Sequence, residues 1–211
     1  MQSLMEISIM LIKMITNISE VVDILRCGGL VAMATDTLFA LSCDATNQSA
    51  VDKLYLVKKR DNEKKLPVFF HSLEHVMEYC ELPQIAITLV KKFWPGKLTV
   101  ILQSRDNFNL LTTNIAVRVP GSHQILEIIR KLNRPIIGTS ANISGCNNLN
   151  KIEEVVAAFA SSDVLIFRGN TTNISGVQST IVSFQNDNIH LIREGAISLD
   201  EIFSSLSENI S

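Results

Sequence analysis

The 211-residue sequence has few cysteines and no motif in which cysteines usually combine. Cys27, Cys43, Cys80 and Cys146 lie far apart and form no C-x-x-C pair. Scattered cysteines of this kind indicate free thiols in a reducing compartment more than disulfides or a metal centre. We therefore expect a cytoplasmic protein with no metal site built from its own side chains.

Long apolar runs are missing as well. The apolar stretch Ile7–Ile12 is far shorter than the roughly 20 residues needed to cross a bilayer. Neither a basic leader nor an A-x-A cleavage site accompanies it, so we expect no secretory signal and no membrane partner. Met1, Met10 and Met14 are each candidate starts. Residues 1–13 are a candidate disordered extension.

The sequence has no large excess of charge of one sign. Its formal net charge is −2, whereas general nucleic-acid scaffolds are usually strongly basic. A local basic cavity remains compatible with this balance. With 46% hydrophobic residues, the composition is typical of a soluble globular protein, and the length favours a single domain. We place that domain at residues 14–206 and expect no second domain.

Short β-branched runs alternate with amphipathic segments along the chain. This alternation predicts an α/β fold, with helices on the faces of a twisted sheet. A hairpin joining 180–184 to 189–192 predicts that the sheet is mixed. The expected helices are 18–27, 49–59 with Ser49 as the N-cap, 72–80, 85–94, 123–132, 152–159 and 199–206. The other expected strands are 30–33, 66–70, 98–102, 115–119, 164–167 and one beginning at 136.

Familiar catalytic motifs are absent too. The sequence has no G-x-x-x-x-G-K-[ST] loop, no nucleophile elbow, no Ser-His-Asp set and no carboxylate pair at useful spacing. His71 and His75 are four residues apart, but no third metal ligand stands near them, so we interpret them as solvated residues at a helix start. What remains is a set of cations, hydroxyls and amides, which favours charge stabilisation and positioning of a substrate.

Several of these polar groups follow apolar strands. Thr139, Ser140 and Asn142 come directly after Ile136-Ile137, where they could form an Asx-turn or donate hydrogen bonds to a polyanion. Thr35-Asp36-Thr37 is either a helix-capping turn or a set of hydroxyls for a small polar substrate.

The basic residues allow two interpretations each. Lys58-Lys59-Arg60 and Lys64-Lys65 could be the solvated end of a helix or a phosphate clamp. Arg118 could be exposed on an edge strand or could bind a carboxylate or phosphate inside a concave face. Ser179-Thr180 and Arg193 are weaker signals by themselves.

Seven ordered segments together resemble the YrdC/TsaC family of threonylcarbamoyl-AMP synthases, which supply the t6A modification of tRNA. The resemblance extends from about residue 17 to 200. The matching segments are 28–41 (GGLVAMATDTLFAL), 58–60 with Lys64, 93–99 (FWPGKLT), 116–120 (AVRVP), 138–145 (GTSANISG), 179–182 (STIV) and 192–195 (IREG).

The resemblance implies a large concave basic cavity and a nucleotidyltransferase activity. The implied reaction converts L-threonine, bicarbonate or CO2, and ATP into L-threonylcarbamoyl-AMP and pyrophosphate. Mg2+ would enter with ATP without dedicated protein ligands, and a t6A transferase complex would take the product. The implied catalytic set is Lys58, Arg60, Ser140 and Asn142. The implied threonine contacts are Thr35, Thr37, Arg118 and Thr139, and the further ATP contacts are Lys64, Ser179, Thr180 and Arg193.

The sequence departs from the family pattern at a few positions. Ala34, Phe39 and Ala40 replace the residues of the usual P-T-D/E-T-x-Y-G-L motif, and Lys97 replaces a proline. Asp36 is expected to shape its turn and to hold no metal. Two alternatives stay open, a module that binds double-stranded RNA or tRNA and a YciO-type paralogue with altered activity. The hydrogenase-maturation carbamoyltransferases contain a similar domain, but nothing here resembles their acylphosphatase or zinc modules.

Overall fold

The computed structural model describes residues 13–61, 64–105, 114–145, 147–186 and 188–207. Its helices are α2 (Ile18–Arg26), α3 (Gln48–Lys58), α4 (Leu73–Tyr79), α5 (Gln84–Phe93), α6 (His123–Leu132), α7 (Ile152–Ala158) and α8 (Leu199–Ser207). Its strands are β1 (Met14–Ile15), β2 (Val31–Ala34), β3 (Phe39–Asp44), β4 (Val68–Phe69), β5 (Cys80–Glu81), β6 (Leu98–Ser104), β7 (Asn114–Arg118), β8 (Ile136–Ser140), β9 (Leu165–Phe167), β10 (Thr180–Gln185) and β11 (Asn188–Arg193).

All of these strands belong to one mixed sheet. The strand order is β1-β9-β2-β3-β8-β4-β7-β6-β10-β11, and β5 pairs with β6 beside this path. The pairs β2–β3 and β3–β8 are antiparallel, whereas β4–β7 and β6–β10 are parallel. The α/β fold with a mixed sheet is therefore confirmed, and so is the hairpin of β10 and β11.

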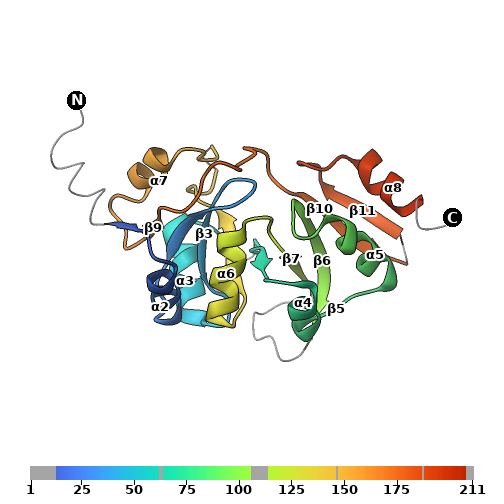
Figure 1. Ribbon diagram of the computed structural model, residues 1–211, viewed down its shortest axis with the longest axis horizontal. Helices are drawn as coiled ribbons and strands as arrows, with labels where there is room; N and C mark the ends of the chain where they lie inside the picture. The colour runs from blue at the N-terminus through green and yellow to red at the C-terminus, as the bar shows by residue number, and fades with distance from the viewer. Residues whose placement is uncertain (1–12, 62–63, 106–113, 146, 187, 208–211) are drawn as a thin grey trace.

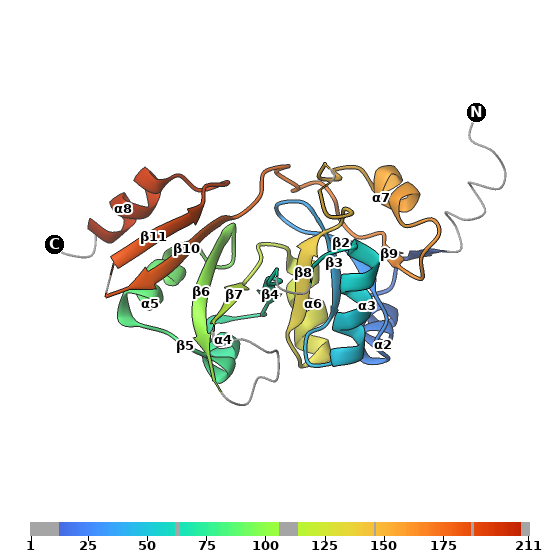
Figure 2. The same ribbon diagram turned by 180° about the vertical axis from the view of Figure 1, so that it is seen from behind.

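The sheet divides into two halves that lie side by side (Figures 1 and 2). Helices α2, α3 and α6 accompany the half that contains β2, β3 and β8, and α5 and α8 lie on the half that contains β6, β10 and β11. Strands β4 and β7 join the halves. The segment between β9 and β10 crosses from one half to the other along the top of the molecule in both views. Segments that lie far apart in the sequence thus meet at the junction between the two halves.

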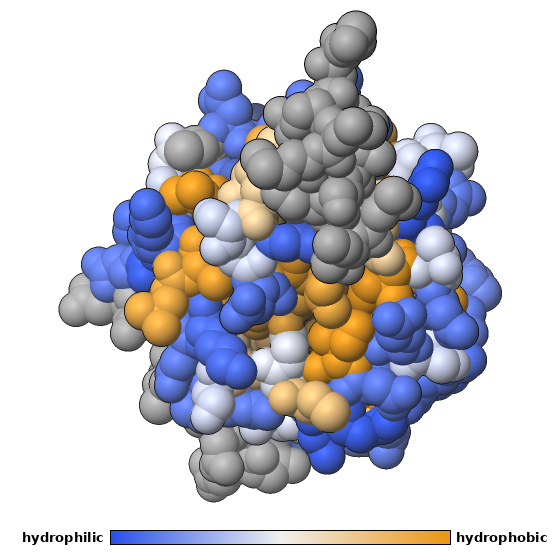
Figure 3. All heavy atoms as spheres, turned by 90° about the vertical axis from the view of Figure 1, so that its left-hand side faces the viewer, coloured by the Kyte–Doolittle hydropathy of each residue, from blue (hydrophilic) through white to orange (hydrophobic). Residues whose placement is uncertain are grey.

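Two apolar clusters stabilise this arrangement. The smaller one includes Val21 and Leu25 of α2 together with Ile125 and Ile128 of α6, all buried. Each fully buried aliphatic side chain of this size contributes roughly 1.5–3 kcal/mol. The larger cluster extends from β2 and β3 through β6 to α8 and thus spans both halves. On the face that lies at the left of Figure 1, apolar atoms gather in a band surrounded by hydrophilic ones (Figure 3).

Strand β3 was not expected from the sequence. Every residue of β3 is buried, because β2 and β8 flank it and both of its faces are covered. Such a strand lacks the alternation of polar and apolar residues that identifies a half-exposed strand. The expected N-cap of α3 was also wrong, since Asn47 and not Ser49 accepts the hydrogen bond from the Ala50 amide.

Residues 1–12 lie outside the described part of the chain, so the expected N-terminal extension stays a prediction. Lys13 is described, and its Nζ donates a hydrogen bond to the Phe159 carbonyl at 2.6 Å. Strand β1 begins at the next residue and runs parallel to β9. Within the described residues, no helix is both long and apolar enough to cross a membrane.

Candidate functional site

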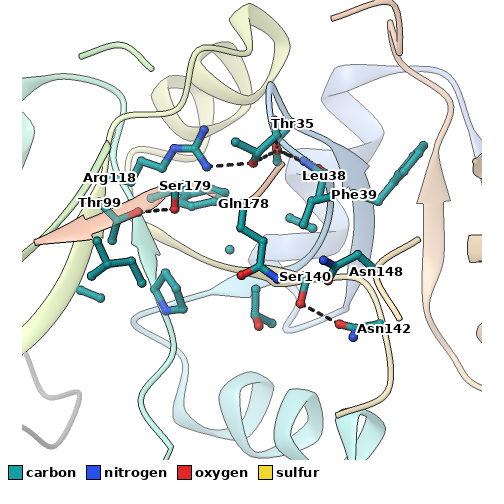
Figure 4. A pocket seen from close by; sticks show the side chains of 18 of the residues that line it. Thr35, Leu38, Phe39, Thr99, Arg118, Ser140, Asn142, Asn148, Gln178 and Ser179 are labelled. Atoms are coloured by element: carbon teal, nitrogen blue, oxygen red, sulfur yellow. Dashed lines mark hydrogen bonds between the residues drawn. The ribbon is translucent and has the colours of Figure 1, made fainter. Parts of the chain in front are cut away.

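A cavity of about 490 Å³ opens at the junction between the two halves of the sheet (Figure 4). Its wall combines the hairpin turn before β3, the end of β8, and parts of β6, β7 and β10. Nine of the twelve predicted site residues line it: Thr35, Thr37, Arg60, Arg118, Thr139, Ser140, Asn142, Ser179 and Arg193. Lys58, Lys64 and Thr180 do not.

The Thr35–Thr37 segment is the tight turn between β2 and β3 and does not cap a helix. Thr35 Oγ1 donates to the Leu38 carbonyl at 2.7 Å and accepts hydrogen bonds from the amides of Thr37 and Leu38. The hydroxyls of Thr35 and Thr37 lie 2.9 Å apart. This network fixes both hydroxyls at the cavity wall, as Figure 4 shows for Thr35.

Arg118 ends β7, which lies between β4 and β6 and is therefore not an edge strand. Its side chain is only 3% exposed. The guanidinium donates to the Gly96 carbonyl at 2.7 Å, to Thr37 Oγ1 at 3.0 Å and to Asp36 Oδ1 at 2.6 Å. Burial lowers the pKa of Arg118 from its usual value, and Asp36 opposes that shift. The expectation of an exposed arginine on an edge strand is therefore wrong, and Arg118 is a buried residue at the cavity wall.

The loop that follows β8 is held from behind by Lys58. Lys58 is 1% exposed, and its Nζ donates to the carbonyls of Ser140 and Asn142 and to Asn142 Oδ1. Ser140 Oγ donates to Asn142 Oδ1 at 2.6 Å. Burial and the neighbouring Arg60 lower the pKa of Lys58 to about 8. The ammonium therefore supports Ser140 and Asn142 instead of facing the cavity itself.

Arg60 and Lys65 are the residues of the basic run that line the cavity. Arg60 follows α3, where Lys59 takes the left-handed conformation and turns the chain. The Arg60 side chain donates to the carbonyls of Lys64 and Lys65, both at 3.1 Å. Lys65 lines the cavity, whereas Lys64 is exposed outside it. If the basic run forms the predicted clamp, Arg60 and Lys65 are its members that reach the cavity.

Ser179, the residue before β10, lies on the cavity wall. Its hydroxyl lies 2.8 Å from Thr99 Oγ1, and its carbonyl accepts from Arg193 at 2.8 Å. Burial lowers the pKa of Arg193. Thr180 points to the opposite side of its strand, where its fully buried hydroxyl exchanges hydrogen bonds with the backbone of Ile197. Thr180 is therefore a structural residue in this fold and does not face a nucleotide in the cavity.

Several lining residues were not predicted. They include Phe69, Thr99, Asn147, Asn148 and Gln178. Thr99 stood inside a segment that matched the family, and this could have identified it. Gln178 and the two asparagines lie on long connections without periodicity, so no pattern in the sequence indicated their position. The Phe69 ring lies 5.7 Å from the Arg118 guanidinium carbon and supports it by a cation–π contact.

The wall contains cations, hydroxyls and amides, and none of its described lining residues is an aspartate or glutamate. In the described ranges, no group of three or more His, Cys, Asp or Glu side chains could hold a metal ion. The described wall therefore offers no carboxylates of its own as metal ligands. His75, expected to be solvated, is buried instead, and burial lowers its pKa to about 4.

The fold and the cavity together define an α/β protein whose cavity presents arginines, hydroxyls and amides from several strands. A family model for Sua5, YciO and YrdC proteins, described as "Telomere recombination", matches residues 23–195. The chain belongs to this family. The resemblance drawn from the motifs is thereby confirmed.

Curated relatives are about one-third identical to this chain over the aligned residues. The threonylcarbamoyl-AMP synthase of Aliivibrio fischeri is 35% identical over 164 residues, which cover 74% of this chain and 89% of the relative. The Bacillus subtilis protein of the same name is 34% identical over 191 residues, covering 88% of this chain and 55% of the relative. The chain thus spans about half the length of that relative.

Two solved structures show the same fold. Pyrococcus abyssi Sua5 complexed with L-threonine matches with a TM-score of 0.84 at 31% identity, covering 90% of this chain and 57% of that one. Escherichia coli YciO matches with a TM-score of 0.79 and covers 90% of this chain and 96% of that one. Its 22% identity supports the fold alone.

Proposed function

We propose that this protein is an L-threonylcarbamoyladenylate synthase, a nucleotidyltransferase that acts in t6A biosynthesis. Relatives that carry this name cover most of the chain, and one of them is matched over 89% of its own length. A structural relative at 31% identity binds L-threonine. The proposed substrates are L-threonine, ATP and bicarbonate or CO2, and the products are threonylcarbamoyl-AMP and pyrophosphate.

The observation that carries the proposal is the meeting of nine predicted residues on one cavity wall. They come from segments that lie up to about 160 residues apart in the chain, so their convergence is a property of the fold. Arg118, Arg60 and Arg193 supply positive charge, while Ser140, Asn142 and Ser179 supply neutral polar groups. This inventory suits a substrate with a carboxylate and phosphates.

The reaction needs positioning more than it needs a protein nucleophile. The threonine amine bonds to CO2 and loses a proton, which gives a carbamate. A carbamate oxygen then bonds to the α-phosphorus of ATP as the bond to the β-phosphate oxygen breaks, and pyrophosphate leaves with that electron pair. Cations that stabilise the leaving group and hold the two reactants in line account for most of the rate in such transfers.

Within this proposal, Arg118, Thr35, Thr37 and Thr139 bind threonine. ATP and the intermediate contact Arg60, Ser140, Asn142, Ser179 and Arg193. Lys58 acts by holding the loop that carries Ser140 and Asn142. Mg2+ would enter with ATP without dedicated protein ligands and would neutralise part of the phosphate charge. The cytoplasmic location, the transfer of the product to a t6A transferase complex and a direct contact with tRNA belong to the same proposal.

The test is release of pyrophosphate by the purified protein in the presence of ATP, L-threonine and bicarbonate. We expect release to stop when threonine is omitted, and mass spectrometry to detect threonylcarbamoyl-AMP. Release that needs no amino acid would indicate a plain nucleotidase and overturn the proposal. No release, together with salt-sensitive tRNA binding that ATP and threonine leave unchanged, would favour the RNA-binding alternative.

The YciO-type alternative has one observation in its favour. Phe39 replaces the tyrosine of the family motif, and it lines the cavity. The matched variant is Phe39→Tyr, which restores the hydroxyl. An inactive parent chain whose Phe39→Tyr variant forms threonylcarbamoyl-AMP would support a paralogue with altered activity.

A further inference from the structure

Arg118 is held in one orientation by partners on three sides. Its Nε, Nη1 and Nη2 donate to Gly96, Thr37 and Asp36, respectively. A guanidinium has five N–H groups, so three are used by these contacts. In the described part of the chain, no further partner is found for the other two, and Arg118 lines the main cavity. These two N–H groups are the ones that can meet an anionic ligand.

Asp36 pairs with Arg118 without facing the main cavity. Its carboxylate is 9% exposed, and its Oδ1 lies 2.6 Å from Arg118 Nη2. Its Oδ2 is buried and has no hydrogen-bond partner among the described residues. Asp36 lines a separate cavity of about 140 Å³ together with residues that include Gly121 and Ser122. A ligand in the main cavity therefore meets the arginine and not the carboxylate.

Hydrogen bonds hold the backbone at Asp36 as well. The Asp36 carbonyl accepts from the Ser175 amide at 3.3 Å, and the Thr37 carbonyl accepts from the Gly176 amide at 2.9 Å. Gly121 leaves the room that the carboxylate occupies, because a Cβ at that position would lie 2.9 Å from Asp36 Oδ2. The carboxylate thus has little freedom to move away from Arg118.

We propose that Asp36 is a positioning residue that acts through Arg118 and sets the affinity for the carboxylate of the amino-acid substrate. This inference rests on the proposed function. Asp36 is the only described carboxylate paired with this buried guanidinium, and Arg193 adds a second positive charge nearby. Without its counter-ion, Arg118 would shift toward solvent in the cavity, and its two N–H groups would lose their alignment.

Asp36→Asn tests the inference because the amide keeps the shape and removes the charge. We expect the KM for threonine to rise about tenfold or more, while the KM for ATP changes by less than about twofold. Asp36→Glu, which keeps the charge, should recover part of the loss. Asp23→Asn is the matched control, since Asp23 also pairs with an arginine, Arg26, but on the exposed surface of α2.

A double substitution distinguishes a positioning role from a general structural one. In an Arg118→Ala background, Asp36→Asn should raise the KM for threonine no further, because the residue through which it acts is gone. Thermal unfolding of each variant shows whether it is folded. A threonine KM that stays at or below the parent value in folded Asp36→Asn would overturn the inference. A parent chain that needs no threonine would instead overturn the proposed function, whatever Asp36→Asn does.

Discussion

Arg60, a cation of the basic run, lines the cavity and has a fixed side chain. The carbonyls of Lys64 and Lys65 hold its guanidinium, and the end of α3 directs it toward the cavity. An arginine fixed before the ligand arrives loses little conformational entropy on binding. Arg60 should therefore contribute to the rate of the reaction and not to the free energy of unfolding.

Removing the Arg60 side chain should reduce activity strongly. Charge-assisted hydrogen bonds are worth roughly 1.5–3 kcal/mol each, so Arg60→Ala should lower kcat/KM by about one to two orders of magnitude. Pyrophosphate release at limiting ATP measures this change. Lys53→Ala, on the exposed side of α3, is the control and should leave the rate unchanged. An Arg60→Ala protein as fast as its parent would contradict the placement of ATP.

Lys58 acts on the same site through its protonation. With a pKa of about 8, it is an ammonium at pH 7 and can donate to all three oxygens of the loop after β8. A neutral amine has only two hydrogens to donate. We therefore expect kcat/KM to decline as the pH rises through about 8, as measured by a pH–rate profile.

The protonation of Lys58 should affect the free energy of unfolding with the opposite dependence on pH. The folded pKa of Lys58 is lower than the roughly 10.4 of an unfolded lysine, so between these values the unfolded chain binds more protons. The contribution of Lys58 to the free energy of unfolding should therefore rise with pH between about 8 and 10.4. Urea unfolding of the parent and of Lys58→Met over this range measures it. A difference between the two that is independent of pH would contradict this assignment.

At the scale of elements, amphipathic segments were the most predictable from the sequence. Helix α6 has the predicted bounds because its isoleucines recur at helical spacing and pack on the sheet. Strand β3 was missed because it is buried on both faces. Thr180 was assigned to the site together with Ser179 from the family motif, although only Ser179 lines the cavity. The residues beside a site can be read from a motif, but the side of a strand that faces the ligand depends on its neighbours in the sheet.

Strand β8 lines the cavity, and position 138 of this strand has room only for a glycine. A Cβ at this position would lie 2.1 Å from the ring of Phe69, the aromatic residue beneath Arg118. Overpacking of this kind costs about 1–3 kcal/mol, so Gly138→Ala should lower the free energy of unfolding by that amount. It should also raise the KM for threonine, because the displaced ring lies against Arg118.

Gly145→Ala is the matched control for this substitution. Gly145 has a positive φ of 86°, but a Cβ there would meet no atom within 4 Å. This variant has backbone strain of about 1 kcal/mol without a clash in the core. Chemical denaturation of both variants separates the two effects. A Gly138→Ala protein no less stable than Gly145→Ala would show that Phe69 can move away freely.

At the scale of the whole molecule, the cavity depends on both halves of the sheet being folded together. Thr35 and Ser140 come from one half, while Thr99 and Ser179 come from the other. The sequence motifs identified most of these residues, but their meeting follows from the order of the strands, which no local pattern encodes. The larger apolar cluster crosses the junction, so we expect the halves to unfold as one unit.

Two buried cysteines can report on this cooperativity. Cys43 lies on β3 in one half, Cys80 lies on β5 in the other, and both belong to the larger cluster. Burial raises the pKa of the Cys43 thiol, and it raises that of Cys80 to about 12. Because the thiolate is the reactive form, neither should react with a thiol reagent in the native protein, whereas the exposed Cys27 should react quickly.

Pulsed alkylation across a urea series, read by peptide mass spectrometry, follows each thiol separately. We expect Cys43 and Cys80 to become reactive at the same urea concentration, because loss of the shared cluster exposes both. Ligand that binds the cavity should move both midpoints upward together, since it contacts both halves and binds only the folded state. If Cys80 became reactive well before Cys43, the half with β6 and β10 would unfold alone. The cavity would then open while the β3 half stays folded. That result would contradict the prediction that the two halves unfold as one unit.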